Sequence, residues 1–124
     1  MKRAVAARVR SVGYALRGGA TLLRTQPNAR IHFVATLAVL VAGIACEISP
    51  GEWALVVVAC ALVWIAEGMN TALEFLADEV SLERRERIKR AKDVAAFSVL
   101  VAAAAAVCVG AVVFGPRVFP LIWK

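Results

Sequence analysis

The sequence has little of the charge and few of the cysteines on which soluble or disulfide-rich domains depend. Charged residues make up 19% of its 124 residues, whereas 61% are hydrophobic. The three cysteines (Cys46, Cys60 and Cys108) are odd in number, far apart and without metal-ligand spacing, so they predict buried free thiols. Long apolar runs in a chain of this size indicate a single integral membrane domain.

Several well-known site motifs are also missing. The chain contains no Walker A loop, no kinase-type glycine-rich loop and no zinc motif, which excludes a kinase with a soluble fold. Its basic residues flank apolar segments instead of gathering beside base-reading side chains, so we expect no nucleic-acid binding. We expect no cleavable signal peptide either, because the first apolar run begins only at Ile31.

The N-terminal region carries basic residues and no acidic residue up to residue 30. Arg3, Arg10, Arg17 and Arg24 recur every seven residues, and an apolar stripe that includes Val9 runs along another side. This pattern predicts an amphipathic helix over residues 1–29 on an anionic membrane surface, which can bend at the two glycines 18–19. Lipid headgroups and nucleotide phosphates are equally suitable partners for these arginines.

Three apolar stretches predict membrane helices over about residues 31–48, 52–79 and 91–115. Pro27 suits the first turn of the first membrane helix, and Gly115 with Pro116 is expected to end the third. Between the second and third lies a polar segment, expected to be a short surface helix or loop with Ser81 as a candidate N-cap. Gly43, Gly68 and the alanines 102–106 permit close helix packing. The predicted fold is therefore all-α, with three transmembrane helices and an N-terminal amphipathic surface helix.

The distribution of positive charge predicts the orientation in the membrane. The first loop, near Glu47 to Glu52, has no lysine or arginine, whereas the N-terminal segment and residues 84–92 are basic. The positive-inside rule places the two basic segments in the cytoplasm, and the first loop and the C-terminus outside. The polar end of the second membrane helix then lies at the cytoplasmic face.

A stripe of polar residues marks the second membrane helix. Glu67, Asn70, Thr71, Glu74 and Asp78 have the spacing i, i+3, i+4, i+7 and i+11, which is one helix face. One explanation is a helix leaving the membrane with solvated acids; the other is a functional site, because carboxylates near a bilayer are costly.

The residue types around this stripe suggest a chemistry. Hard oxygen ligands suit Mg²⁺ that arrives bridged to phosphates, and nearby basic residues such as Lys92 suit phosphate oxygens. Composition and spacing alone predict a membrane site that binds a cation and an anion, and they do not identify the reaction.

Two segments of the sequence carry a family resemblance. Residues 67–78 follow the pattern E-x-x-N-S/T-A-x-E-x-x-x-D, and residues 90–96 begin with R/K-A-K-D. Both resemble the bacterial diacylglycerol kinase / undecaprenol kinase family, and residues 24–32 look like the segment before its first membrane helix. The resemblance covers nearly the whole chain.

The resemblance implies a multi-pass lipid kinase of the bacterial inner membrane with its active site on the cytoplasmic side. It implies a homotrimer with shared active sites, which phosphorylates a lipid alcohol in the bilayer with ATP and Mg²⁺. Diacylglycerol and undecaprenol both present a primary hydroxyl beside apolar tails, and the sequence does not decide between them.

The resemblance also assigns roles to residues. Glu67 matches the catalytic carboxylate, and Glu67 with Asn70 would contact the lipid substrate. Glu74 matches a ligand of the metal carried with ATP. The residues matched to the nucleotide site are Asn70, Glu74, Asp78, Lys92 and Asp93, with Arg10, Tyr14 and Arg17 approaching from the surface helix.

One position departs from the family pattern. Gln26 stands where many members have a glutamate as a second metal ligand, and its neutral carbonyl oxygen is a poorer partner for Mg²⁺. This departure keeps open a catalytically degenerate family member. A small non-enzymatic transporter using Glu67 is a further alternative, although Glu67 lies towards the end of its apolar run and not at its middle.

Overall fold

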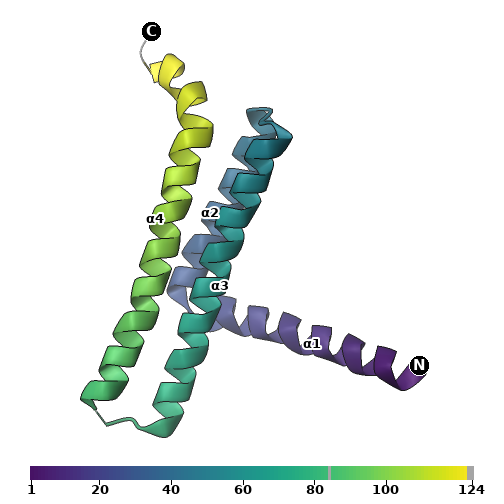
Figure 1. Cartoon of the computed structure of the whole chain (residues 1–124), viewed down its shortest axis with the longest axis vertical. Coiled ribbons are helices and arrows are strands. Elements are labelled where there is room, and N and C mark those ends of the chain that lie inside the picture. The colour runs from purple at the N-terminus through teal and green to yellow at the C-terminus, as the bar shows by residue number, and fades with distance from the viewer. Residues whose placement is uncertain (84, 123–124) are drawn as a thin grey trace.

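The computed structural model describes residues 1–83 and 85–122 and confirms the all-α fold. Its four helices are α1 (Lys2–Thr25), α2 (Pro27–Ala45), α3 (Pro50–Val80) and α4 (Glu86–Ile122). Helices α2, α3 and α4 are each long and apolar enough to cross a membrane. Helix α1 projects sideways from these three upright helices (Figure 1).

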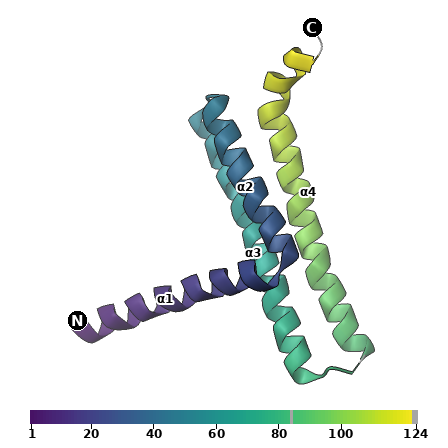
Figure 2. The same cartoon turned by 180° about the vertical axis from the view of Figure 1, so that it is seen from behind.

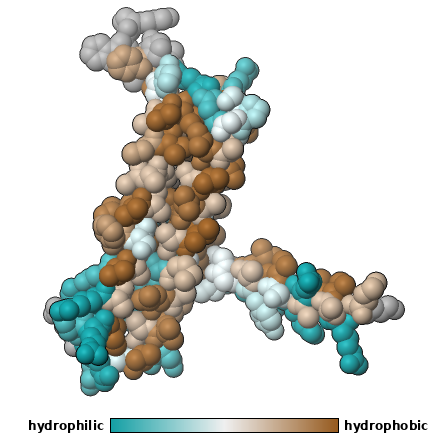
Figure 3. Space-filling model, viewed as in Figure 1, coloured by the Kyte–Doolittle hydropathy of each residue, from teal (hydrophilic) through white to brown (hydrophobic). Residues whose placement is uncertain are grey.

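Helix α3 is the centre of the bundle, because it contacts both α2 and α4. Seen from behind, α2 lies against α3 while α4 stands beside them (Figure 2). A small core of Ile48, Val56 and Val113 joins the three helices near the α2–α3 turn. Apolar side chains cover most of the upright helices, and hydrophilic residues gather at their two ends and along α1 (Figure 3). This surface is the one expected of a protein surrounded by lipid.

The corner between α1 and α2 depends on three residues. Gln26 has an extended backbone, and Pro27 begins α2 at its first position, as predicted. The guanidinium of Arg30 donates to the carbonyl oxygens of Leu23 (2.9 Å) and Arg24 (2.6 Å). Arg30 thereby satisfies carbonyl groups that the end of α1 leaves without helical partners, and it fixes the turn.

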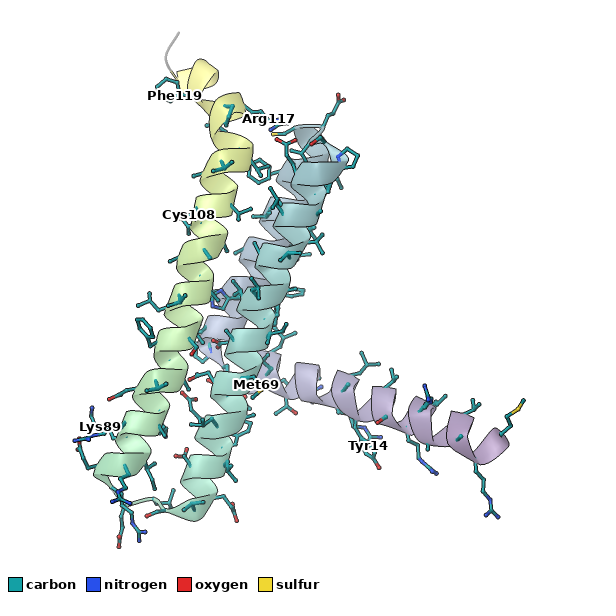
Figure 4. The ribbon with its side chains drawn as sticks, viewed as in Figure 1. Tyr14, Met69, Lys89, Cys108, Arg117 and Phe119 are labelled. Carbon is teal, nitrogen blue, oxygen red and sulfur yellow. The ribbon has the colours of Figure 1, made fainter. Side chains whose placement is uncertain are left out.

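At the opposite end of the bundle, α3 begins with a capping box. The backbone N–H of Ser49 donates to Glu52 Oε2 at 2.7 Å, and the N–H of Glu52 donates to Ser49 Oγ at 3.4 Å. Arg117 on α4 donates to both Glu52 carboxylate oxygens, at 2.8 and 2.9 Å, and to the carbonyl oxygen of Val113 at 2.6 Å. These bonds tie α4 to the beginning of α3 (Figure 4).

Several predicted boundaries were wrong. Helix α4 begins at Glu86 instead of residue 91, and it continues beyond Gly115 and Pro116 to Ile122. Pro116 removes a helical hydrogen bond and its ring crowds the preceding turn, but the bonds of Arg117 to Glu52 and to the carbonyl oxygen of Val113 hold this part of α4 against α3. Ser81 is the C-cap of α3 and not an N-cap, since its N–H donates to the carbonyl oxygen of Ala77.

The predicted roles of the small residues have mixed outcomes. Helix α1 runs through Gly18 and Gly19 without interruption. Gly43 is closely packed, because a Cβ there would lie 2.7 Å from Trp53 Cη2. A Cβ on Gly68 would meet nothing within 4 Å, so this glycine is not at a close helix contact within the chain.

Candidate active site

The polar stripe of α3 begins with a buried carboxylate. The Glu67 side chain is only 1% exposed, and Asn70 and Thr71 on the same face are buried as well. Among the described residues, Glu67 Oε2, Asn70 Oδ1 and Thr71 Oγ1 have no hydrogen-bond partner. A buried polar atom without a partner lowers the stability of the fold, so it requires another explanation, such as a ligand. Glu67 is therefore not a solvated acid at the end of a membrane helix.

An open cavity of about 360 Å³ lies beside Glu67, between α2, α3 and α4. We call it the Glu67 cavity; its polar lining comes from Glu67, Asn70 and Glu74 on α3 and from Asn28 and His32 on α2. Asn70 Nδ2 donates to Glu74 Oε1 at 3.2 Å, which orients that carboxylate. The Asn70 amide oxygen and Glu67 Oε2 have no partner in the described part of the chain.

The two polar residues from α2 were not assigned to the site from the sequence. Their spacing of four residues places both on one face of α2, and that face forms a wall of the Glu67 cavity. The i, i+4 spacing of these two polar side chains at the start of an apolar helix is the signal that could have identified them.

A hydrogen-bonded pair fixes the register of α2 against α3. Trp64 Nε1 donates to Thr36 Oγ1 at 3.1 Å, and that hydroxyl donates to the carbonyl oxygen of His32 at 2.7 Å. Thr36 lies one helical turn after His32, and Trp64 lies three residues before Glu67. The pair thus holds His32 and Glu67 on neighbouring walls of the same cavity.

A second open cavity, of about 380 Å³, lies where α3 leads into α4. We call it the Asp78 cavity; its described lining includes Asp78, Lys92 and Asp93, together with Arg85 and Lys89. Lys92 Nζ lies 2.8 Å from Asp78 Oδ1, and Lys89 Nζ lies 2.6 Å from Asp93 Oδ2. These ion pairs are largely exposed, so the basic groups are accessible to an anion.

The candidate residues of the three-helix bundle thus form two neighbouring groups. Glu74 belongs to the Glu67 cavity, and Asp78 follows it by one turn of α3. The first group offers carboxylate and amide oxygens, which suit a hydroxyl or a hard cation. The second group offers lysine and arginine, which suit phosphate oxygens.

The candidate residues of α1 and the α1–α2 junction are not brought to these cavities within the chain. Arg10, Tyr14 and Arg17 are exposed on α1, which leads away from Met69 on α3 (Figure 4). The Arg17 guanidinium lies 5.8 Å from the centre of the Tyr14 ring, a cation–π contact within α1. Gln26 lies at the corner between α1 and α2 and is not among the residues that line the Glu67 cavity.

The oxygen atoms of the Glu67 cavity fit a cation that arrives with a ligand. Among residues 1–83 and 85–122, no group of three or more histidine, cysteine or acidic side chains is placed to hold a metal ion. Mg²⁺ usually takes one or two carboxylates and completes its shell with water and substrate phosphates. Glu74 supplies one such carboxylate, and Glu67 Oε2 and Asn70 Oδ1, which have no partner among the described residues, lie nearby. This set of oxygen atoms fits Mg²⁺ that shares its remaining ligands with water and phosphate.

Comparisons with known proteins identify the family of this chain. The family described as prokaryotic diacylglycerol kinase matches residues 13–114. An undecaprenol kinase of Bacillus subtilis is 32% identical over 108 residues, covering 87% of this chain and 88% of that protein. A diacylglycerol kinase of Synechocystis sp. is 38% identical over 113 residues, and the match covers 90% of this chain and 65% of the Synechocystis protein.

A third relative comes from another bacterium. A diacylglycerol kinase of Pseudomonas aeruginosa is 33% identical over 92 residues, covering 74% of this chain and 75% of that protein. The family match spans α2, α3 and most of α4, and so includes both cavities. The chain belongs to the prokaryotic diacylglycerol kinase family and is a lipid kinase.

Proposed function

We propose that this protein transfers the γ-phosphate of ATP to the primary hydroxyl of a membrane lipid, with Mg²⁺ carried by the nucleotide. The observation that supports this most is the buried Glu67 carboxylate, which lines an open cavity and whose Oε2 has no hydrogen-bond partner among the described residues. A carboxylate in this position can accept or orient the proton of a lipid hydroxyl as that oxygen attacks phosphorus. No donor among residues 1–83 and 85–122 competes for Oε2, so this atom can take that hydrogen bond.

The neighbouring residues would divide the remaining tasks. Asn70 orients the Glu74 carboxylate and offers its own amide oxygen to the hydroxyl or the cation. Glu74 would hold the Mg²⁺ of the nucleotide, which neutralises charge on the phosphates. Asp78, Lys92 and Asp93 would hold the nucleotide one turn away, with Lys92 directed to phosphate oxygens.

The geometry of α1 supports the expected homotrimer with shared active sites. Arg10, Tyr14 and Arg17 are exposed on α1, which projects from the bundle (Figure 1), and they are not among the described residues that line the Glu67 cavity or the Asp78 cavity. In a trimer this helix would reach the nucleotide site of a neighbouring subunit. The basic residues of α1 and of the α3–α4 connection would then face the cytoplasm of a bacterial cell.

The lipid is proposed as diacylglycerol or undecaprenol. Relatives at 32% and 38% identity carry these two names, so similarity does not separate the substrates. Both lipids combine a primary hydroxyl with long apolar chains, which is the chemistry that a polar cavity within a membrane bundle accepts.

The experiment is transfer of labelled γ-phosphate from ATP in mixed micelles, with diacylglycerol and undecaprenol offered separately, with and without Mg²⁺. We expect transfer to at least one lipid, and we expect it to stop when Mg²⁺ is removed. Binding of ATP without transfer to either lipid would favour the degenerate alternative that Gln26 suggests. Transport of a solute coupled to Glu67, with no transfer, would favour the transporter.

A further inference from the structure

His32 is the single histidine of the chain, and it lies across the Glu67 cavity from the buried carboxylate. Its half-buried side chain lines the cavity from α2, whereas Glu67 lines it from α3. The imidazole and the carboxylate are close enough to interact electrostatically. We propose that His32 is a positioning residue for phosphate transfer, an inference that rests on the proposed function. Its ring N–H donates a hydrogen bond to Glu67 and holds that carboxylate towards the lipid hydroxyl.

The register of the two helices places His32 level with Glu67. Helices α2 and α3 run antiparallel, because only residues 46–49 connect them. The hydrogen bond between Trp64 and Thr36 sets a common level on the two helices. From that level, and in the same direction, His32 lies about 6 Å along α2 and Glu67 about 4.5 Å along α3, at 1.5 Å per residue.

The other polar residue of α2 lies one turn further along the cavity. Asn28 is about 6 Å beyond His32, whereas Asn70 and Glu74 are about 4.5 and 10.5 Å beyond Glu67 on α3. Asn70 already donates its amide N–H to the Glu74 carboxylate. The two amides therefore belong to the level of Glu74, and His32 is the N–H donor opposite Glu67.

Among the described lining residues, no other side chain at this level can hold Glu67 in the same way. The α4 wall carries no polar side-chain atom and consists of Ala96, Val99, Leu100 and Ala103. Glu74 also interacts electrostatically with Glu67, but two carboxylates repel each other. A neutral imidazole carries one N–H donor, and catalytic hydrogen bonds often shorten only when the substrate is bound.

The fold does not require an imidazole at position 32. The hydroxyl of Thr36 donates to the backbone carbonyl oxygen of His32 at 2.7 Å, and any side chain at this position leaves that bond in place. A replacement of His32 should therefore change the reaction without changing the packing of α2 on α3.

The single histidine permits a test that does not depend on turnover. Protein without a histidine tag is labelled with ¹⁵N-histidine, so that the spectrum contains only the ring of His32. The ring nitrogen resonances are measured in micelles at one pH, with and without diacylglycerol. We expect Glu67→Gln to shift them because the hydrogen-bond partner changes, whereas Glu79→Gln, an exposed change on α3, should not. Identical ring resonances in Glu67→Gln and the unmodified protein, in both samples, would overturn the proposal.

Steady-state kinetics separate positioning from lipid binding. His32→Leu should lower kcat about tenfold or more, and it should change the KM for ATP and for the lipid by less than about twofold. His32→Gln retains an N–H donor and should recover most of kcat. Phe33→Leu, an exposed change at the next residue, should leave kcat unchanged. A raised KM for the lipid with unchanged kcat, or equal losses of kcat in both His32 variants, would contradict the proposal.

The kinase proposal can fail separately from this one. A shift of the His32 ring resonances in Glu67→Gln, without phosphate transfer by the unmodified protein, would overturn the kinase proposal and retain the pairing of His32 with Glu67. Transfer by the unmodified protein, with the same kcat in His32→Leu, would retain the kinase and overturn the role of His32.

Discussion

Lys92 on α4 donates a hydrogen bond to Asp78 on α3, with 2.8 Å between Nζ and Oδ1, and so joins the two helices beside the site. The side chains are 36% and 56% exposed, respectively. An ion pair as exposed as this contributes little to the stability of a fold. The ion pair instead keeps the Lys92 ammonium group beside the carboxylates of α3. A bound phosphate group would be a second anionic partner for this lysine.

Replacing Lys92 should therefore affect nucleotide binding more than folding. For Lys92→Met we expect the KM for ATP to rise about tenfold, because a charged partner of the phosphates is lost. The midpoint of thermal unfolding should change little. Arg87→Met is the matched control, since Arg87 is exposed and lines neither cavity. An unchanged KM together with a large fall in the unfolding midpoint would show that Lys92 is only structural.

Glu67→Gln should abolish phosphate transfer while retaining ATP binding. The amide keeps the size of the side chain but cannot accept a proton, so we expect kcat to fall by at least about a hundredfold. The measurement is labelled-phosphate transfer beside equilibrium binding of a fluorescent ATP analogue. Full transfer by this variant would remove Glu67 from the reaction.

Glu67→Leu should increase stability as it removes activity. Glu67 is 1% exposed, and one of its carboxylate oxygens lacks a partner among the residues that the structure describes; an unpaired buried group of this kind destabilises a fold by about 1–3 kcal/mol. We therefore expect a higher midpoint of thermal unfolding in detergent than for the unmodified protein. A lower midpoint would show that Glu67 has a stabilising partner, and the explanation of its burial by function would lose its main support.

Glu74→Gln should weaken the dependence on Mg²⁺. Asn70 holds the Glu74 carboxylate by a 3.2 Å hydrogen bond, and removing its charge should raise the Mg²⁺ concentration for half-maximal transfer by about tenfold or more. Glu79→Gln, an exposed change on the same helix, is the control. Superimposable Mg²⁺ titrations of the two variants would argue against Glu74 as a metal ligand.

The polar stripe of α3 could be predicted because helical periodicity alone places Glu67, Asn70 and Thr71 on one face, and that face is buried. Asn28 and His32 were missed because a polar residue near the start of a helix has an ordinary explanation without a ligand. Only the packing of α2 on α3 makes them walls of a cavity.

Other features depend on contacts that no local pattern contains. Helix α4 continues past Pro116 in a structure where Arg117 bonds to Glu52, a residue 65 positions earlier in the chain. The direction of α1 likewise depends on Arg30 and its bonds to the preceding carbonyl groups. The long-range contact of Arg117 with Glu52 overrides the local signal of the Gly-Pro pair.

Packing at Gly43 gives a prediction on stability that is separate from the reaction. A Cβ at this position would lie 2.7 and 2.9 Å from two ring carbons of Trp53 and 3.1 Å from Ile48 Cδ1. Gly43→Ala should therefore lower the free energy of unfolding by about 1–3 kcal/mol through overpacking. Gly115→Ala is the control, because nothing lies within 4 Å of a Cβ there.

The partner ring offers a rescue that identifies the cause. Trp53→Phe removes part of the indole, so the double variant Gly43→Ala/Trp53→Phe should recover stability relative to the sum of the two single changes. Trp53 precedes Glu67 by fourteen residues, about 21 Å along α3, so phosphate transfer at low temperature should persist in the folded fraction of each variant. Strictly additive effects in thermal unfolding would show that the methyl group does not clash with this ring. Because transfer and unfolding are measured separately, such a result would revise the packing near the α2–α3 turn and leave the assignment of Glu67 unaffected.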